Sequence, residues 1–265
     1  MTASPATLEL DGLRIRYKLS GDGPSTLVVL QGWGTNLAVY DSIAAALPPG
    51  CRFLQFDLPG FGASDEPREP WNVDAYADFF CRFMQALGIA NATLLGHSYG
   101  GRVILKLASR DALPFRLDRI VLVDSAGIVN PKSARLRLKI RWYKCLKRLF
   151  SIPVVHALFP ELVDDWKSRQ GSADYRNATP LMRQCLVMAV NEDLRHLLPR
   201  VKQDTLLVWG ENDTATPLSD ARLMESWLPN AGLAVVKGAG HYPFLDQPAV
   251  FGSILRAFLE PGGAP

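Results

Sequence analysis

The stretch LLGHSYGGRVILKLA, residues 94–108, decides the fold. An apolar run ends at Gly96, and an amphipathic helical pattern begins directly after Ser98. This is a strand, a tight turn and a helix around the motif Gly-x-Ser-x-Gly, residues 96–100. Small residues are needed on both sides because a side chain there would collide with the neighbouring strand or helix. We expect a strained serine whose hydroxyl stands above the sheet edge, at the positive end of the helix.

Further apolar runs surround this stretch. Residues 8–21 predict a hairpin, because Asp11-Gly12 is a two-residue turn signal between alternating runs. Continuous apolar runs, typical of strands buried on both faces, occupy residues 25–32, 51–60, 92–98, 118–127, 204–213 and 232–241. Helical patterns lie between them at residues 73–87, 99–110, 219–228 and 248–259. This alternation predicts an α/β fold, with a mostly parallel central sheet and helices on both faces.

The alternation stops between residues 128 and 199, where we expect an inserted helical cap; residues 1–127 and 200–265 would then form the core domain. From Lys132 to Arg148 the insertion carries eight basic residues and no acidic one. Arg137, Arg141, Lys144 and Arg148 share one helical face, which we interpret as solvated. Contact with an anionic membrane surface, or attraction of a carboxylate-bearing substrate, are the alternatives.

Composition limits the class of protein. The chain has 265 residues, 48% apolar content and a formal charge of +3, which is too small to argue for nucleic acid. Four scattered cysteines without a Cys-x-x-Cys pair predict buried free thiols in a reducing compartment. No signal peptide and no apolar run of about 20 residues is visible, so we expect a cytoplasmic protein. The sequence contains no phosphate loop, dinucleotide fingerprint or metal-ligand cluster.

A serine hydroxyl needs a base to become a nucleophile, and the chain has four histidines. His97 adjoins the serine and should point away from its hydroxyl, and His156 and His196 fall in the cap. His241 directly follows the last strand, at the edge of the sheet where Ser98 is expected. We therefore predict His241 as the base, with His196 as the alternative.

A carboxylate should orient this histidine. Asp213 follows the strand at 204–213 and precedes Pro217 and a helix, a suitable loop for the role, with Glu211 as its neighbour. Asp124 also ends a strand at the same edge and competes with it. We favour Asp213, and the alternative stays open.

Taken together, GHSYGG, FDLPGFGASD, WGENDTATP and GAGHYPFLDQP, in this order, resemble the α/β-hydrolase family over residues 7–130 and 200–260. The order Ser98, Asp213, His241 is the family's order. The resemblance implies an oxyanion hole made by the backbone N–H groups of Tyr99 and Trp33. It also makes Asp57 and its neighbouring glycines structural. Gln31 is a departure, since the family commonly has His there.

The expected function is that of a serine hydrolase that cleaves a carboxylic ester, lactone or thioester through an acyl-enzyme, without cofactor or metal. The substrate would be a small, hydrophobic, ester-like molecule; the oligomeric state is open. Ser98 in place of aspartate argues against dehalogenases and epoxide hydrolases. Alternatives on the same triad are a C–C bond hydrolase, an aminopeptidase that uses Glu161, Asp164 and Asp165 of the cap, or a slow-turnover ligand sensor.

Overall fold

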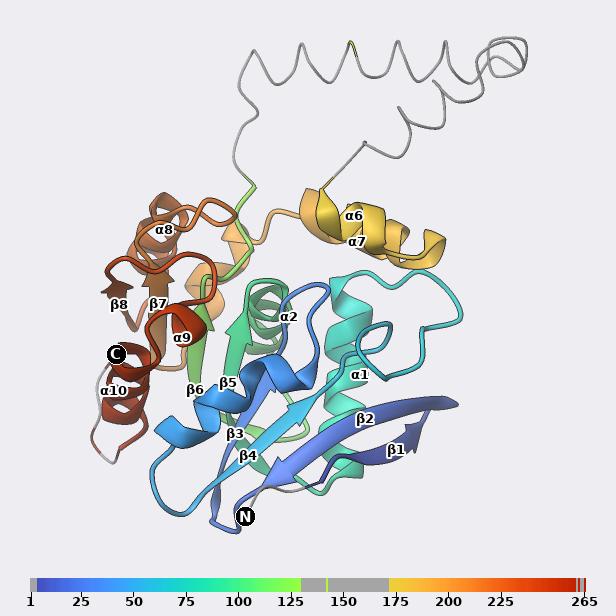
Figure 1. The fold of residues 1–265 in the computed structure, drawn as a ribbon, viewed down its shortest axis with the longest axis horizontal. Coiled ribbons are helices and arrows are strands. Elements are labelled where there is room, and N and C mark those ends of the chain that lie inside the picture. The colour runs from blue at the N-terminus through green and yellow to red at the C-terminus, as the bar shows by residue number, and fades with distance from the viewer. Residues whose placement is uncertain (1–3, 130–141, 143–171, 261, 263–264) are drawn as a thin grey trace.

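The structure is a computed structural model that describes residues 4–129, 142, 172–260, 262 and 265. Within these ranges the chain forms an eight-stranded sheet of order β1-β2-β4-β3-β5-β6-β7-β8 (Figure 1). The strands are β1 (Ala6–Leu10), β2 (Leu13–Ser20), β3 (Ser25–Leu30), β4 (Cys51–Phe56), β5 (Asn91–His97), β6 (Arg116–Val123), β7 (Thr205–Gly210) and β8 (Ala231–Val236). The pairings of β2 with β1 and β4 are antiparallel and the others parallel, which confirms the predicted hairpin and mostly parallel sheet.

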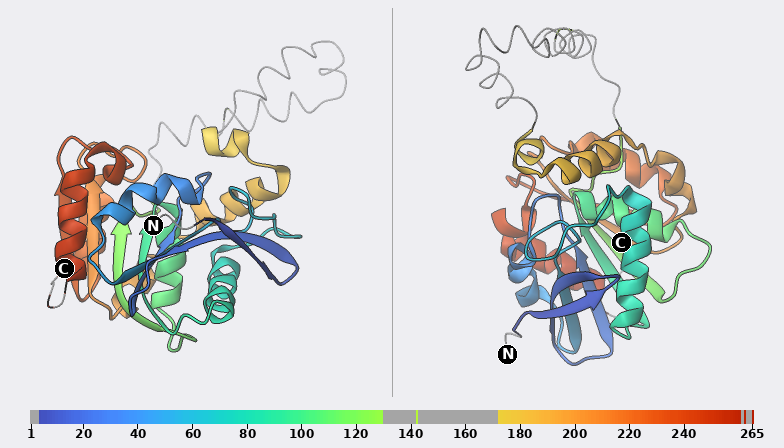
Figure 2. Two further views of the ribbon diagram at one scale, coloured as in Figure 1. Left: turned by 60° about the horizontal axis from the view of Figure 1, so that its bottom comes forward. Right: turned by 90° about the vertical axis from the view of Figure 1, so that its right-hand side faces the viewer.

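Helices cover both faces of this sheet (Figures 1 and 2). One face carries α1 (Val73–Ala86), α2 (Tyr99–Ala108) and α8 (Leu218–Trp227), and the other carries the 3₁₀ helix η1 (Leu37–Ala46), α9 (Pro243–Asp246) and α10 (Pro248–Leu259). Successive strand residues point to opposite faces, so Leu94 belongs to the first core and Leu95 to the second. Burial on both faces is the reason that the strands read as continuous apolar runs.

The predicted helices agree with the structure to within two residues. The side chain of Asn72 caps α1 by accepting a hydrogen bond from the Ala75 N–H at 2.9 Å, and Gly88 follows its end. The 3₁₀ helix η1 was not predicted, because its residues show no clear helical period. Its start is set locally, by the side chain of Asn36 accepting from the Ala38 N–H at 3.0 Å.

The second half of the predicted cap is helical where it is described. It contains α6 (Ala173–Asn177), α7 (Pro180–Asn191) and the 3₁₀ helix η2 (Arg195–Arg200), and α6 and α7 lie across the carboxyl ends of the central strands (Figure 1). The basic face at residues 137–148, His156 and the acidic group at 161–165 lie outside the described residues. The boundaries 128–199 of the cap therefore stay a prediction.

The cysteines differ in one respect from the expectation. Cys81 and Cys185 are buried free thiols, as predicted, whereas Cys51 is only half-buried because it begins β4 at the end of the sheet. Cys145 lies outside the described residues. In the part of the chain that the structure describes, no helix combines the length and apolar character needed to cross a bilayer.

The turn from β5 into α2 leaves no room for a side chain two residues before or two residues after the serine. A Cβ atom on Gly100 would lie 1.9 Å from the carbonyl oxygen of Leu30, at the end of β3. A Cβ on Gly96 would lie 2.7 Å from the backbone nitrogen of Gly101. Helix α2 therefore crosses the end of β3 at backbone contact, as the motif predicts.

Substitution Gly100→Ala should destabilise the fold, because the new methyl group meets backbone atoms that cannot rotate away. We expect a loss of about 2–4 kcal/mol in the free energy of unfolding. Urea denaturation followed by circular dichroism measures it. A loss below about 0.5 kcal/mol would mean that α2 can shift away from β3.

Candidate active site

Ser98 occupies the strained turn predicted for it. Its φ of 50° and ψ of −109° lie outside the regions that L-residues normally adopt. The surrounding backbone holds it there: the Ser98 N–H donates to the carbonyl of Val123 at 3.0 Å, and its own carbonyl accepts from Gly101 at 3.1 Å and Ala126 at 3.0 Å. The serine immediately precedes α2, whose N-terminal N–H groups favour developing negative charge.

His241 and Asp213 meet at the same edge of the sheet. The Nδ1 atom of His241 lies 2.8 Å from Oδ2 of Asp213, although the two residues come from different loops. Asp213 also accepts hydrogen bonds from the N–H of Ala215 at 2.7 Å and the hydroxyl of Thr216 at 2.6 Å. Burial acts to raise the pKa of Asp213, but the hydrogen bonds from His241 and Thr216 outweigh it and lower this pKa to about 2. The carboxylate therefore stays ionised and holds the ring of His241 by Nδ1–H.

Asp124, the competing carboxylate, is positioned differently. It is fully buried behind Asp213, and its Oδ1 atom accepts the N–H of Gly210 at 2.9 Å. Among the described residues its Oδ2 atom has no hydrogen-bond partner. Burial raises the pKa of Asp124 to about 9, and the charge of Asp213 contributes to the shift. Asp124 is thus a neutral acid behind the pair, whereas Asp213 contacts the histidine.

His97 connects two loops of the site. Its Nε2 atom lies 2.8 Å from the carbonyl of His241, which only accepts, so Nε2 carries the proton. Its Nδ1 atom then accepts from the hydroxyl of Tyr40 at 3.1 Å, and that hydroxyl accepts the N–H of Gly32 at 2.7 Å. Burial lowers the pKa of His97 to about 3, so the ring is neutral. The role of His97 is structural, as expected, but its link to the Gly32 loop was not predicted.

Trp33 and Tyr99, the two residues whose N–H groups the resemblance implies as oxyanion donors, lie next to each other. Trp33 follows Gly32 in the loop after β3, and Tyr99 is the first residue of α2, so its N–H has no acceptor one turn back. The two rings pack edge to face with centroids 5.2 Å apart, and Phe61 packs on Trp33 at 4.8 Å. The Trp33 side chain is thus both a support for this loop and a wall of the adjoining cavity.

Gln31, which stands where the family commonly has His, is hydrogen-bonded to two loops. Its side chain is buried; the amide Nε2 donates to the carbonyl of Thr35, and Oε1 accepts the N–H of Leu58 at 3.2 Å. One side chain therefore joins the loop of Trp33 to the loop after β4. Asp57 braces that second loop, since Oδ1 accepts the N–H of Leu37 at 2.7 Å.

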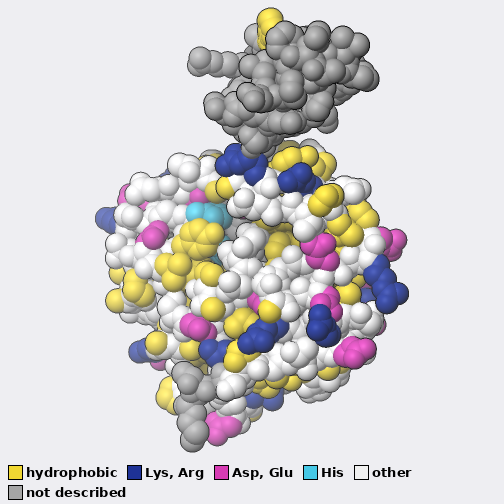
Figure 3. Space-filling model, turned by 45° about the vertical axis from the view of Figure 1, so that its right-hand side comes forward, with side chains coloured by type: hydrophobic (Ala, Val, Ile, Leu, Met, Phe, Trp, Pro, Cys, Tyr) yellow, Lys and Arg dark blue, Asp and Glu magenta, His cyan; other side chains and the backbone are white. Residues whose placement is uncertain are grey.

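A cavity of about 380 Å³ connects these groups. Its wall includes Ser98, His241, Trp33 and Tyr99, so the predicted residues gather around one space, with Asp213 behind the histidine. The wall also includes Arg102, Ile128, Leu186, Ala189 and Asp220, which sequence reasoning did not select. In the space-filling view a histidine reaches the surface beside a group of hydrophobic side chains (Figure 3).

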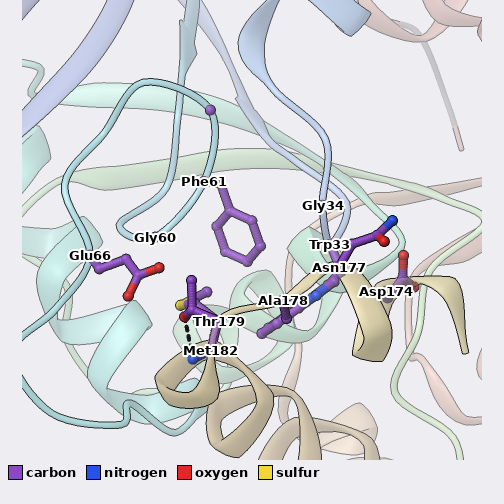
Figure 4. A pocket seen from close by; sticks show the side chains of 11 residues that line it. Trp33, Gly34, Gly60, Phe61, Glu66, Asp174, Asn177, Ala178, Thr179 and Met182 are labelled. Carbon is purple, nitrogen blue, oxygen red and sulfur yellow. Dashed lines mark hydrogen bonds between the residues drawn. The ribbon is translucent and has the colours of Figure 1, made fainter. Parts of the chain in front are cut away.

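A second cavity of about 230 Å³ adjoins the first and shares Trp33 and Asp174 with it. Figure 4 shows Phe61 and Glu66 on one side of this space and Thr179 with Met182 on the other. The loop after β4 and the start of α7 therefore face each other across it.

Other candidate residues have simpler environments. His196 is exposed on η2 and does not line the cavity that contains Ser98.

Within the described ranges Asp124, Asp213 and His241 bring potential metal-ligand atoms within 4.8 Å of one another. Two of these atoms are already hydrogen-bonded to each other and the third belongs to a neutral acid, which favours a proton network over a cation site.

Comparison with known proteins agrees with this architecture. The family model described as the Alpha/beta hydrolase family matches residues 27–253. The chain is 29% identical over 260 residues to the pimeloyl-[acyl-carrier protein] methyl ester esterase of Nitrosomonas europaea, covering 92% of this chain and 98% of that protein. It is 26% identical over 288 residues to an uncharacterized protein of Mycobacterium tuberculosis, covering 97% and 82%. An esterase structure from Exiguobacterium antarcticum matches with TM-score 0.73 and 24% identity, covering 95% of this chain and 98% of that one.

The chain therefore belongs to the α/β-hydrolase family. It is a hydrolase of the α/β-hydrolase type, which confirms the predicted fold and enzyme class.

Substitution Tyr40→Phe should destabilise the site, because it leaves the N–H of Gly32 and Nδ1 of His97 without their partner. We expect a loss of about 1–3 kcal/mol in the free energy of unfolding. Urea denaturation measures it, with Tyr175→Phe, an exposed side chain on α6, as the control. Equal stabilities of the two variants would mean that the buried hydroxyl contributes nothing.

Substitution Asp124→Asn should remove one cause of the loss in folding stability that the wild type shows as pH rises. The pKa of Asp124 is about 9 in the fold against about 3.8 when unfolded, so between these values the folded state holds one more proton. Stability of the wild type should therefore fall, relative to the variant, as pH rises from about 4 to 9. Urea unfolding of both proteins at several pH values measures the difference. A difference that does not change with pH would show Asp124 to be ionised in the fold.

Proposed function

We propose that the protein hydrolyses a carboxylic ester through an acyl-enzyme, with Ser98 as nucleophile, His241 as base and Asp213 as the orienting carboxylate. The observation that carries this proposal is the 2.8 Å contact of His241 with Asp213 at the wall of the cavity that holds Ser98. Because the ionised Asp213 accepts a hydrogen bond from Nδ1–H of His241, the other ring nitrogen, Nε2, carries no proton and can accept one.

The proposed reaction has two halves. His241 takes the hydroxyl proton of Ser98, the serine oxygen attacks the ester carbonyl carbon, and a tetrahedral oxyanion forms. The C–O bond to the alcohol then breaks, and the alcohol leaves with the proton from His241. In the second half His241 deprotonates a water molecule, which attacks the acyl carbon and releases the carboxylic acid and Ser98.

The backbone N–H groups of Tyr99 and Trp33 are the proposed donors to the oxyanion. Each such donor is worth about 10²–10³ in rate. The bonds from Gly32 to Tyr40 and from Gln31 to Thr35 hold the loop of Trp33 in place, so this donor needs no rearrangement during the reaction.

The ester substrate is supported by the relatives. The Nitrosomonas europaea relative is described as a methyl ester esterase, and the matching Exiguobacterium antarcticum structure as an esterase. A lactone or a thioester would react by the same steps. Hydrolysis of a C–C bond, aminopeptidase activity and slow ligand sensing stay alternatives on the same triad, but no contact among the described residues favours them over an ester.

We further propose that residues 128–199 form a cap that closes this site, on the core of residues 1–127 and 200–265. The support is the position of α7, which contributes Leu186 and Ala189 to the cavity wall.

A fluorophosphonate probe and nitrophenyl esters test the mechanism. The wild type should be labelled and hydrolyse the ester, whereas Ser98→Ala should do neither. We expect His241→Ala to lose at least about 10⁵-fold in kcat because the base itself is removed. Asp213→Asn should lose about 10⁴-fold, because the neutral amide favours the wrong tautomer of the histidine. His196→Ala is the matched control and should keep full activity, since its side chain is exposed.

The acid is assigned by comparing Asp213→Asn with Asp124→Asn. If only Asp124→Asn abolished activity, Asp124 would be the orienting residue. Labelling of the wild type with negligible ester turnover would favour the sensing alternative. A wild type that is not labelled would contradict the nucleophilic role of Ser98.

A further inference from the structure

Arg102 is a buried cation in the wall of the cavity that contains Ser98. It lies on α2, four residues after the serine, and is only 5% exposed. Side chains of a helix lean toward its N-terminus, so a residue in this position extends back toward the turn. One turn of helix rises about 5.4 Å, which brings the arginine within the span of a small acyl group.

The guanidinium of Arg102 makes few contacts for its charge. Its Nη1 donates to the backbone carbonyl of Glu192 at 2.7 Å, and among the described residues no carboxylate forms a salt bridge with it. The nearby acids pair elsewhere, Glu192 with Lys106 at 2.5 Å and Asp193 with Arg195. Burial lowers the pKa of Arg102, but an arginine keeps its proton in proteins. In the part of the chain that the structure describes, one acceptor thus serves the five N–H donors of the guanidinium.

Among the described residues, the acidic side chains in the cavity wall form no ion pair with Arg102. Asp174 is exposed to water at α6. Asp220 is buried but engaged in its own interactions, and its charge acts on Arg195. A buried charge is costly unless a counter-charge or hydrogen bonds compensate it.

The wall between these polar groups is apolar. Ile128, Leu186 and Ala189 are all buried side chains that line the same cavity. A short methylene chain fits this surface, and a carboxylate matches the planar fork of a guanidinium.

We infer that Arg102 binds a carboxylate at the far end of the acyl chain, so that the preferred substrates are half-esters of dicarboxylic acids. The inference rests on the proposed function for the position of the ester, which would lie at Ser98. The inference concerns the acyl part of the substrate, whose far end would carry the free carboxylate. Arg102 would then determine specificity and take no part in bond breaking.

Binding tests the inference without turnover. The probes are monomethyl half-esters from succinate to suberate and the corresponding dimethyl diesters, titrated by calorimetry into Ser98→Ala. We expect one chain length to bind at least about tenfold more tightly as half-ester than as diester, because the carboxylate forms charge-assisted hydrogen bonds. Adding Arg102→Gln to Ser98→Ala should abolish this preference, and Arg102→Lys should restore part of it.

Arg110→Gln is the matched control. Arg110 directly follows the end of the same helix and pairs with Asp78 at 2.8 Å on the surface, so its loss should leave the preference unchanged. Circular dichroism checks that each variant is folded. If the Arg102 variants do not fold, the comparison of half-esters with diesters in Ser98→Ala still tests the inference.

Two results would overturn the inference. One is equal binding of half-esters and diesters at every chain length. The other is a preference that persists in the folded Arg102→Gln variant, which would assign Arg102 only the structural tie to Glu192. Turnover of the same half-esters by the wild type is a separate measurement: binding without hydrolysis would contradict the proposed function and leave the carboxylate site established.

Discussion

The crossing of α2 over the end of β3 is the constraint on which the site depends. Backbone meets backbone there, with no room for a side chain at Gly100, and Ser98 consequently adopts a φ of 50°. This strain is maintained because the flanking β5 and α2 are buried in the core and cannot relax. The same crossing brings the first N–H groups of α2 beside the loop of Trp33, so one packing contact positions both the candidate nucleophile and the candidate oxyanion donors.

Buried polar groups connect the loops at this edge of the sheet. Tyr40 and His97 join the loop of Gly32 to that of His241, and Gln31 joins it to the loop after β4. Such networks are specific because a group left unpaired in the interior costs about 1–3 kcal/mol. Asp124 is an exception: it retains an unpartnered oxygen next to Asp213, and its neutral form avoids a second negative charge there.

Much of the fold could be predicted because its signals are local. Apolar runs mark the buried strands, Asn72 and Gly88 mark the ends of α1, and Gly-x-Ser-x-Gly marks the turn at Ser98. The signals were weaker where a residue acts through distant partners. Arg102 has the pattern of an ordinary helix residue, and η1 lacks a helical period, so neither was selected from the sequence. The available clue was a basic residue two positions after the end of the motif, within the first turns of a helix that is otherwise largely buried.

The sequence by itself determined the order of the strands and of the longer core helices, the tight turn at Ser98 and the short group of histidines from which a base could come. It left two carboxylates, Asp124 and Asp213, because both follow strands whose carboxyl ends meet at one edge of the sheet. Only the tertiary structure decided which of them contacts His241, since that depends on how β6, β7 and the loop after β8 pack. There Asp124 turns inward to the N–H of Gly210, and Asp213 makes the contact with the histidine.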